Sequence, residues 1–88
     1  MKKSIGVLGS GSWATALVKI FSENTSNINW FIRNSDVIEQ IKRDKKNPKY
    51  LSYVDLNLNK IKISSEIDEI INASDIIIIA IHLHLLNH

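Results

Sequence analysis

The sequence has no cysteine among its 88 residues and only a small excess of positive charge. Without cysteine there is no disulfide framework, no thiolate nucleophile and no zinc knuckle, which fits a reducing compartment such as the cytoplasm. A formal net charge of +2 is too small to indicate a nucleic-acid partner. The apolar run from Ile76 to Ile81 is much shorter than the roughly 20 residues that a membrane span needs. The composition, 44% hydrophobic and 23% charged, is that of an ordinary globular chain.

Glycine is also scarce, and two of the three glycines lie in one short segment near the N-terminus. Residues 9–14 read Gly-Ser-Gly-Ser-Trp-Ala, between an apolar run at 4–8 and a helical pattern that starts near Ser12. A Gly-x-Gly-x-x-Ala turn in this strand–turn–helix context is typical of a dinucleotide-binding fingerprint. Gly9 would allow the sharp turn, Gly11 would let the backbone approach a pyrophosphate, and Ala14 would keep helix and strand close. The free N–H groups at the helix start would then hold the phosphates. The alternative is a glycine turn that serves packing alone.

Apolar periodicity along the chain predicts alternating strands and helices. Strands are expected over 4–8, 28–32, 60–64 and 76–81, and a packed irregular segment over 49–60. The first helix, over 12–23, has an apolar stripe that Trp13 and Ile20 widen. The second begins at an Asn34 cap and continues to Lys46, where Asn47-Pro48 stops it. The third follows a capping box made by Ser65 and Asp68.

The order βαβαβαβ with right-handed crossovers predicts a Rossmann-type parallel sheet of strand order 3-2-1-4. We therefore expect residues 1–88 to form one α/β domain, an incomplete half of a doubly wound fold. The last strand is apolar on both faces, a pattern typical of a central parallel strand that is covered on both sides. The predicted order places this strand at an edge, however, so we expect self-association through it, and the chain looks cut short.

Arg33 is the next informative residue, because it follows the second strand where a cofactor ribose would lie. No acid lies between Ile28 and Ser35 to bind the 2′-hydroxyl of NAD, and an arginine can bind the 2′-phosphate of NADP. The sequence therefore favours NADP over NAD. The alternative interpretation of Arg33 is a solvated charge at the end of a strand.

His82 and His84 could be half of a metal site, but no third ligand is identifiable and no metal site is predicted. No base–nucleophile pair is recognisable, so no catalytic residue is predicted. The basic cluster at 42–49 is interpreted as a solvated helix end.

The segment from Val7 to Leu17 carries a more specific resemblance. Its Gly-Ser-Gly-Ser-Trp-Ala-Thr-Ala-Leu resembles the Gly-x-Gly-Ser-Trp-Gly-Thr-Ala-Leu signature of the soluble NAD(P)-dependent glycerol-3-phosphate dehydrogenases. Asn47-Pro48-Lys49-Tyr50-Leu51 resembles that family's Asn-Pro-x-Tyr-Leu, and 30–33 and 73–75 add support. The resemblance implies that Ser12 and Trp13 contact the phosphates and nicotinamide side, Arg33 the adenosine end, and Tyr50 a neighbouring position. The predicted cofactor-binding residues are Gly9, Ser10, Gly11, Ser12, Trp13, Ala14, Arg33 and Tyr50.

The resemblance also implies a function and makes the departures from the family informative. The family reduces dihydroxyacetone phosphate to sn-glycerol 3-phosphate with a nicotinamide hydride, for phospholipid synthesis, and we expect this chain to be cytoplasmic. Ala14 replaces the family's third Gly, and Ile32 replaces a more polar residue. Ile81-His82-Leu83-His84 stands where the family has Val-Pro-Ser, and the later lysines and helical substrate domain are missing. We therefore expect 82–88 not to be family-like, and the chain to be a cofactor-binding part without turnover of its own. The alternatives are a stand-alone dinucleotide-binding or sensor module, and a fragment of a related hydroxyacid or hydroxyacyl dehydrogenase.

Overall fold

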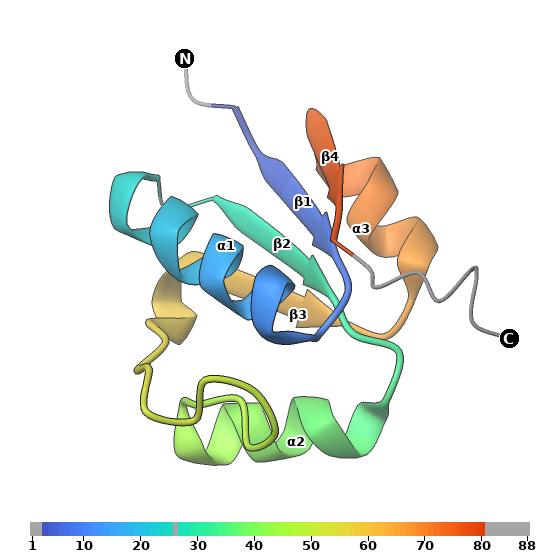
Figure 1. Ribbon diagram of the computed structural model, residues 1–88. Coiled ribbons are helices and arrows are strands. Elements are labelled where there is room, and N and C mark those ends of the chain that lie inside the picture. The colour runs from blue at the N-terminus through green and yellow to red at the C-terminus, as the bar shows by residue number, and fades with distance from the viewer. Residues whose placement is uncertain (1–2, 26, 81–88) are drawn as a thin grey trace, which may run out of the picture.

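The computed structural model describes residues 3–25 and 27–80, and strands and helices alternate along them as predicted (Figure 1). One short 3-10 helix, η1, lies within the segment that was predicted to be irregular. His82, His84 and His88 lie outside the described residues, as does the whole of 82–88. The elements are β1 (Ile5–Leu8), α1 (Ser12–Asn24), β2 (Ile28–Phe31), α2 (Ser35–Asp44), η1 (Leu58–Lys60), β3 (Ile61–Ser64), α3 (Ile67–Ala73) and β4 (Ile76–Ile79).

The four strands form one parallel sheet of order β3-β2-β1-β4, which confirms the predicted topology. Ile5 pairs with Ile28 on one side and with Ile76 on the other, and Ile28 pairs with Ile61. Helix α1 lies on one face of the sheet and α3 on the other (Figure 1). This arrangement follows from right-handed crossovers, because the chain runs from β1 to β3 in one direction and must then cross back to β4.

The core is built from the strands, one stripe of α1 and one face of α2. Val7, Ile28 and Trp30 are fully buried in the centre of the sheet. Ala14 and Val18 bring α1 onto them, as the periodicity predicts. The predicted widening of that stripe is wrong, because Trp13 and Ile20 are 67% and 51% exposed. The remaining buried positions of α1 are polar, at Thr15 and Ser22, and their hydroxyls donate to backbone carbonyls of the same helix region.

The ends of α2 and α3 differ in part from the predicted caps. Asn34 caps α2 as expected, since its Oδ1 accepts the N–H groups of Asp36 and Val37. The helix ends at Asp44 rather than at Lys46, because Lys45 adopts a left-handed conformation (φ 59°) and closes the last turn. The predicted capping box of α3 is wrong. Its N-cap is Glu66, which makes no side-chain cap bond, and Ser64 rather than Ser65 accepts the Glu66 N–H, at 2.9 Å.

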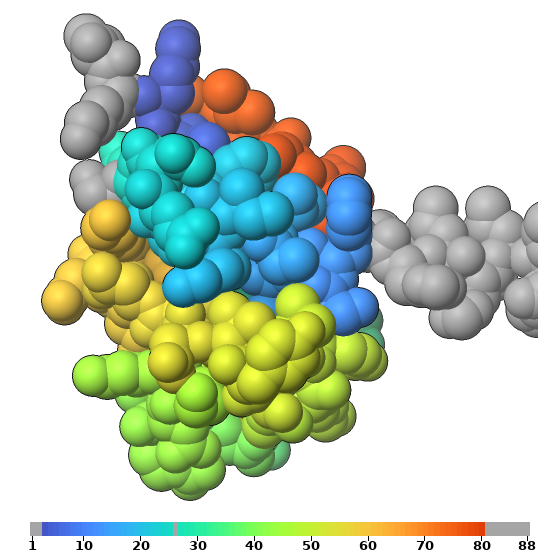
Figure 2. Space-filling view, turned by 60° about the vertical axis from the view of Figure 1, so that its left-hand side comes forward, coloured from blue at the N-terminus to red at the C-terminus, as the bar shows by residue number. Residues whose placement is uncertain are grey.

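The segment between α2 and η1 is packed, as predicted. It lies between α1 and α2, in yellow in Figure 2. Leu56 is buried, Val54 and Leu58 pack against the core, and the Leu56 N–H donates to the Lys45 carbonyl. Tyr53 is the most exposed of its large apolar side chains, at 78%. The segment therefore has a defined place against α1, and this matters for the site.

Strand β4 lies at the edge of the sheet, as the strand order predicts, and its outer side is open. Ile76 and Ile79 are 46% and 66% exposed, and Ile77 and Ile78 are half-buried. The apolar composition of β4, which is typical of a covered central strand, therefore does not match its edge position, as the predicted strand order implied. The strand is nonetheless well anchored at its start, because the Asp75 carboxylate accepts the Ser4 N–H at 2.9 Å.

Candidate functional site

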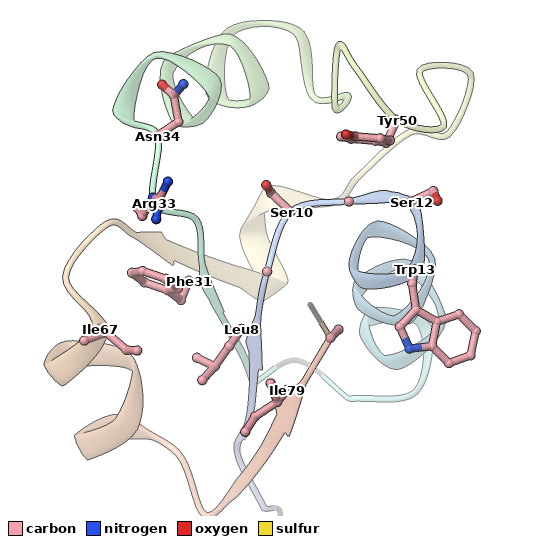
Figure 3. Close-up of a pocket in the computed structure, with 13 residues that line it drawn as sticks. Leu8, Ser10, Ser12, Trp13, Phe31, Arg33, Asn34, Tyr50, Ile67 and Ile79 are labelled. Atoms are coloured by element: carbon pink, nitrogen blue, oxygen red, sulfur yellow. The ribbon is translucent and has the colours of Figure 1, made fainter. Parts of the chain in front are cut away.

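A groove of about 960 Å³ lies over the carboxyl ends of the sheet strands (Figure 3). Because the chain continues from β1 to β2 on one side and β4 returns on the other, this is the switch point of the sheet. Ligands of open parallel α/β sheets bind at this position. Its lining is formed by Leu8, Gly9, Ser10, Gly11, Ser12, Trp13, Phe31, Arg33, Asn34, Tyr50, Ile67, Ile79 and Ala80.

The glycine turn between β1 and α1 forms the centre of the groove. Gly9 has φ 128°, a conformation that residues with a Cβ rarely adopt, so the turn itself requires glycine there. Gly11 differs, because its φ of −74° suits any residue, and a Cβ built on it would meet no protein atom within 4 Å. The packing of this chain does not require glycine at 11. An open approach to the backbone at that position fits a ligand that comes close to Gly11.

The start of α1 supplies groups that could hold an anion. Gly11 is the N-cap and makes no side-chain cap bond, and the first turn has no acidic residue. The first N–H groups of the helix and the positive end of its dipole are therefore directed at the groove without a competing carboxylate. Backbone N–H groups in this arrangement bind phosphates.

Two buried polar side chains hold the turn in place, and neither was identified as a site residue from the sequence. The Trp30 indole donates to the Gly9 carbonyl at 2.6 Å. Asn47 Nδ2 donates to the Ser10 carbonyl and to Thr15 Oγ1, both at 2.9 Å. The sequence predicted Trp30 as part of a strand and Asn47 as a helix stop; their polar partners depend on contacts between distant segments.

The groove brings together most of the residues that were predicted to bind a cofactor. All of them except Ala14 line it, and Ala14 is fully buried where α1 meets the sheet. Arg33 follows β2 and is exposed beside Asn34, and Tyr50 lies at the rim (Figure 3). Arg33 forms no ion pair within the described residues. The additional lining residues are mainly apolar ends of strands, a position that the switch-point rule could have indicated: Leu8, Phe31, Ile79 and Ala80.

The described residues have neither a metal cluster nor a membrane helix. No three histidine, cysteine, aspartate or glutamate side chains gather there into a group that could hold a metal. Within the same ranges no helix has the length and apolar character needed to cross a bilayer.

Comparison with known proteins is consistent with this geometry. A family model described as NAD-dependent glycerol-3-phosphate dehydrogenase N-terminus matches residues 4–88. The chain belongs to this family. The family resemblance inferred from the glycine turn and its flanking residues is thereby confirmed.

Several glycerol-3-phosphate dehydrogenases [NAD(P)+] are similar to it over most of its length. The enzyme of Bacillus subtilis is 33% identical over 79 residues, which is 90% of this chain and 23% of the enzyme. That of Neorickettsia sennetsu is 37% identical over 75 residues, 85% of this chain and 22% of the enzyme. The enzyme of Sphingopyxis alaskensis is 31% identical over 84 residues, which is 96% of this chain and 25% of the enzyme. The chain thus spans about a quarter of the length of these relatives.

A solved structure supports the fold. The crystal structure of the glycerol-3-phosphate dehydrogenase of Coxiella burnetii superposes with a TM-score of 0.78. The two sequences are 23% identical, and the superposition covers 89% of this chain and 24% of the Coxiella burnetii enzyme. The parallel sheet of order 3-2-1-4 is therefore the Rossmann-like part of that fold.

Proposed function

We propose that this chain binds a nicotinamide adenine dinucleotide in the switch-point groove, as the cofactor-binding part of a glycerol-3-phosphate dehydrogenase. The observation that carries the proposal is the open backbone at Gly11. No protein atom lies within 4 Å of a Cβ built there, at the start of a helix without a side-chain cap. A pyrophosphate seated on the backbone at 10–12 gives a physical reason for a glycine that packing does not require.

The remaining lining residues suggest how the two ends of the cofactor would lie. Figure 3 shows Arg33 and Trp13 on opposite sides of Ser10. With the pyrophosphate at the turn, the adenosine would extend past the end of β2 toward Arg33, and the nicotinamide toward the ends of β1 and β4. The apolar side chains of Leu8 and Ile79 there would exclude water from one face of a ring.

We infer a preference for NADP over NAD from the charge of the groove. Among the described residues that line the groove, Arg33 is the charged one, and none is an aspartate or glutamate. A guanidinium can bind a 2′-phosphate through two hydrogen bonds, whereas a 2′-hydroxyl is best held by a carboxylate. Arg33 forms no ion pair within the described ranges, so a phosphate would not have to displace a carboxylate.

The whole reaction of the related enzymes is proposed only for a longer protein. When bound, the dinucleotide supplies or accepts a hydride, which interconverts dihydroxyacetone phosphate and glycerol 3-phosphate. In the described part of the chain the groove has no histidine, lysine, aspartate or glutamate to move the accompanying proton. We therefore expect this chain to bind and orient the cofactor without turning over substrate. A cytoplasmic location fits its lack of cysteine.

A fluorescence titration with NADPH and NADH tests both the binding and the preference. The wild-type chain should bind both, with NADPH tighter. Arg33→Ala should lower the affinity for NADPH by about tenfold, which corresponds to the loss of one charge-assisted hydrogen bond. The affinity for NADH should stay nearly unchanged. Lys42→Ala is the matched control, because it removes a similar exposed charge from the last turn of α2, outside the groove lining. Absence of binding would refute the proposed function. Equal affinities that Arg33→Ala does not alter would refute the NADP preference alone.

A further inference from the structure

Three successive carbonyl oxygens of the glycine turn are held from beneath by the protein. Each accepts a hydrogen bond from a side chain that is almost completely buried, at most 1% exposed. None of these three side chains lines the groove. The bonds join Gly9 O to Trp30 Nε1 at 2.6 Å, Ser10 O to Asn47 Nδ2 at 2.9 Å, and Gly11 O to Thr15 Oγ1 at 2.8 Å.

These bonds, together with the helical bond from the Thr15 N–H to Gly11 O at 2.9 Å, determine where the next N–H groups point. A trans peptide is planar, so each carbonyl and the N–H of the following residue point in opposite directions, and the described residues contain no cis peptide. Carbonyls bonded to the interior therefore turn the N–H groups of Ser10, Gly11 and Ser12 toward the groove side. None of these three N–H groups donates to another atom within the described ranges. Successive N–H groups with a common direction form a concave anion site.

Asn47 has a second task in the same place. Its Oδ1 accepts the N–H groups of Lys49 and Tyr50, at 3.0 and 3.3 Å. Its Nδ2 bonds Ser10 O and Thr15 Oγ1, so the donors and the acceptor of the amide are all used. One buried side chain thus joins the segment that carries Tyr50 to the turn beneath the proposed phosphate site.

We propose that Asn47 is a positioning residue for dinucleotide binding: it orients the peptide planes of the glycine turn so that their N–H groups face the pyrophosphate, and it sets the place of Tyr50 at the groove rim. The inference rests on the proposed function, since it assumes a pyrophosphate at the turn. Asn47 does not itself contact the ligand, because it lies beneath the turn and outside the groove lining. Its substitution should therefore reduce affinity through the turn.

The test compares Asn47→Ala with Asn29→Ala. Asn29 is a matched control, because it is also buried and its Nδ2 also donates twice, to Ala73 O at 3.2 Å and Ser74 Oγ at 3.1 Å, away from the turn. Both variants should unfold at lower temperature than the wild type. Only Asn47→Ala should bind NADPH more weakly, by about tenfold or more, because a misaligned N–H loses a charge-assisted hydrogen bond. If the wild type binds NADPH and Asn47→Ala binds it equally well, the role of Asn47 is refuted and the proposed dinucleotide binding is not.

A pair of substitutions at Thr15 decides the question if Asn47→Ala does not fold. Thr15→Val keeps the shape of the side chain but removes the hydroxyl that bonds both Asn47 and Gly11 O, and it should weaken NADPH binding. Thr15→Ser keeps the hydroxyl and should restore the affinity, which a loss of packing alone would not do. Equal affinities of Thr15→Val and Thr15→Ser would count against the inference. A wild type without any dinucleotide affinity would instead overturn the proposed function itself.

Discussion

The sharpest prediction concerns Gly11→Val, which should separate ligand binding from folding. The φ of Gly11, −74°, suits valine, and the space next to its Cα is free of protein atoms within 4 Å of a Cβ. The new side chain would stand where we place the pyrophosphate. Gly11→Val should therefore fold and fail to bind.

The expected change in stability is small because two effects oppose each other. Replacing a glycine whose conformation other residues can adopt stabilises a protein by about 0.4–1 kcal/mol through the unfolded chain. An apolar residue at a helix N-cap is worse than glycine by roughly 0.5–1 kcal/mol. The net effect is about 1 kcal/mol or less, which for a domain of this size moves the unfolding midpoint by no more than about 4–8 °C.

The expected change in affinity is large. A charge-assisted hydrogen bond contributes about 1.5–3 kcal/mol, and a branched side chain at Gly11 would separate the phosphate from at least two N–H groups. The loss should reach at least about a hundredfold in dissociation constant. Fluorescence titration with NADPH measures the affinity, and thermal unfolding followed by circular dichroism measures the stability of the same sample.

Gly9→Ala is the control that should behave differently. Gly9 has φ 128°, so a Cβ there costs about 1–3 kcal/mol in backbone strain and should lower the unfolding midpoint. Binding of NADPH by Gly11→Val within a few-fold of the wild type would contradict a pyrophosphate at Gly11. A larger loss of stability in Gly11→Val than in Gly9→Ala would also contradict it, because Gly11 would then have a packing role.

Three further predictions concern the fold. Gly6→Ala should destabilise the protein by about 1–3 kcal/mol in urea unfolding, because its Cβ would lie 2.5 Å from the Oγ of Ser74; an unchanged midpoint would show that the turn before β4 can move aside. The N–H and hydroxyl of Ser4 hold the pKa of Asp75 below its ordinary value, so this stabilisation is present above the unfolded pKa of about 3.9 and is lost as pH falls through the lower folded value. Asp75→Asn should therefore show a shallower fall of unfolding temperature below pH 4 than the wild type, and parallel curves would contradict this role. Ile79→Lys should reduce self-association in light scattering, because Ile79 is 66% exposed on the edge strand; equal scattering from both proteins would place the contact elsewhere.

Much of the fold could be predicted because periodicity and crossover handedness act locally. The alternation of strands and helices, the strand order and the Asn34 cap were all predicted from short segments. The errors at the end of α2 and the start of α3 are local, whereas the error in α1 depends on tertiary packing. Trp13 and Ile20 read as part of an apolar stripe, yet both side chains are more than half exposed in the folded chain. The isoleucines of β4 have the composition of a buried central strand, yet the strand lies at an edge, as the predicted order required.

In the candidate site, too, some residues could be predicted from local sequence and others depend on tertiary contacts. The Gly-x-Gly turn, its helix and Arg33 could be identified from the sequence, because a strand that ends at a glycine turn and opens a helix can form only a few structures. Asn47 could not, since an asparagine before a proline is read as a helix stop, and nothing local shows that its amide reaches Ser10.

The sequence by itself therefore determined the element order, the parallel sheet and the position of the glycine turn, because these depend on side-chain spacing and backbone chirality. Only the tertiary structure decided which carbonyls of the turn are held from beneath, and by which residues. Buried polar side chains must be satisfied, but their partners come from segments far apart in the chain, such as Trp30 with Gly9 and Asn47 with Ser10. It also decided how far each isoleucine of β4 is exposed, since burial of a strand depends on its neighbours and not on its own composition.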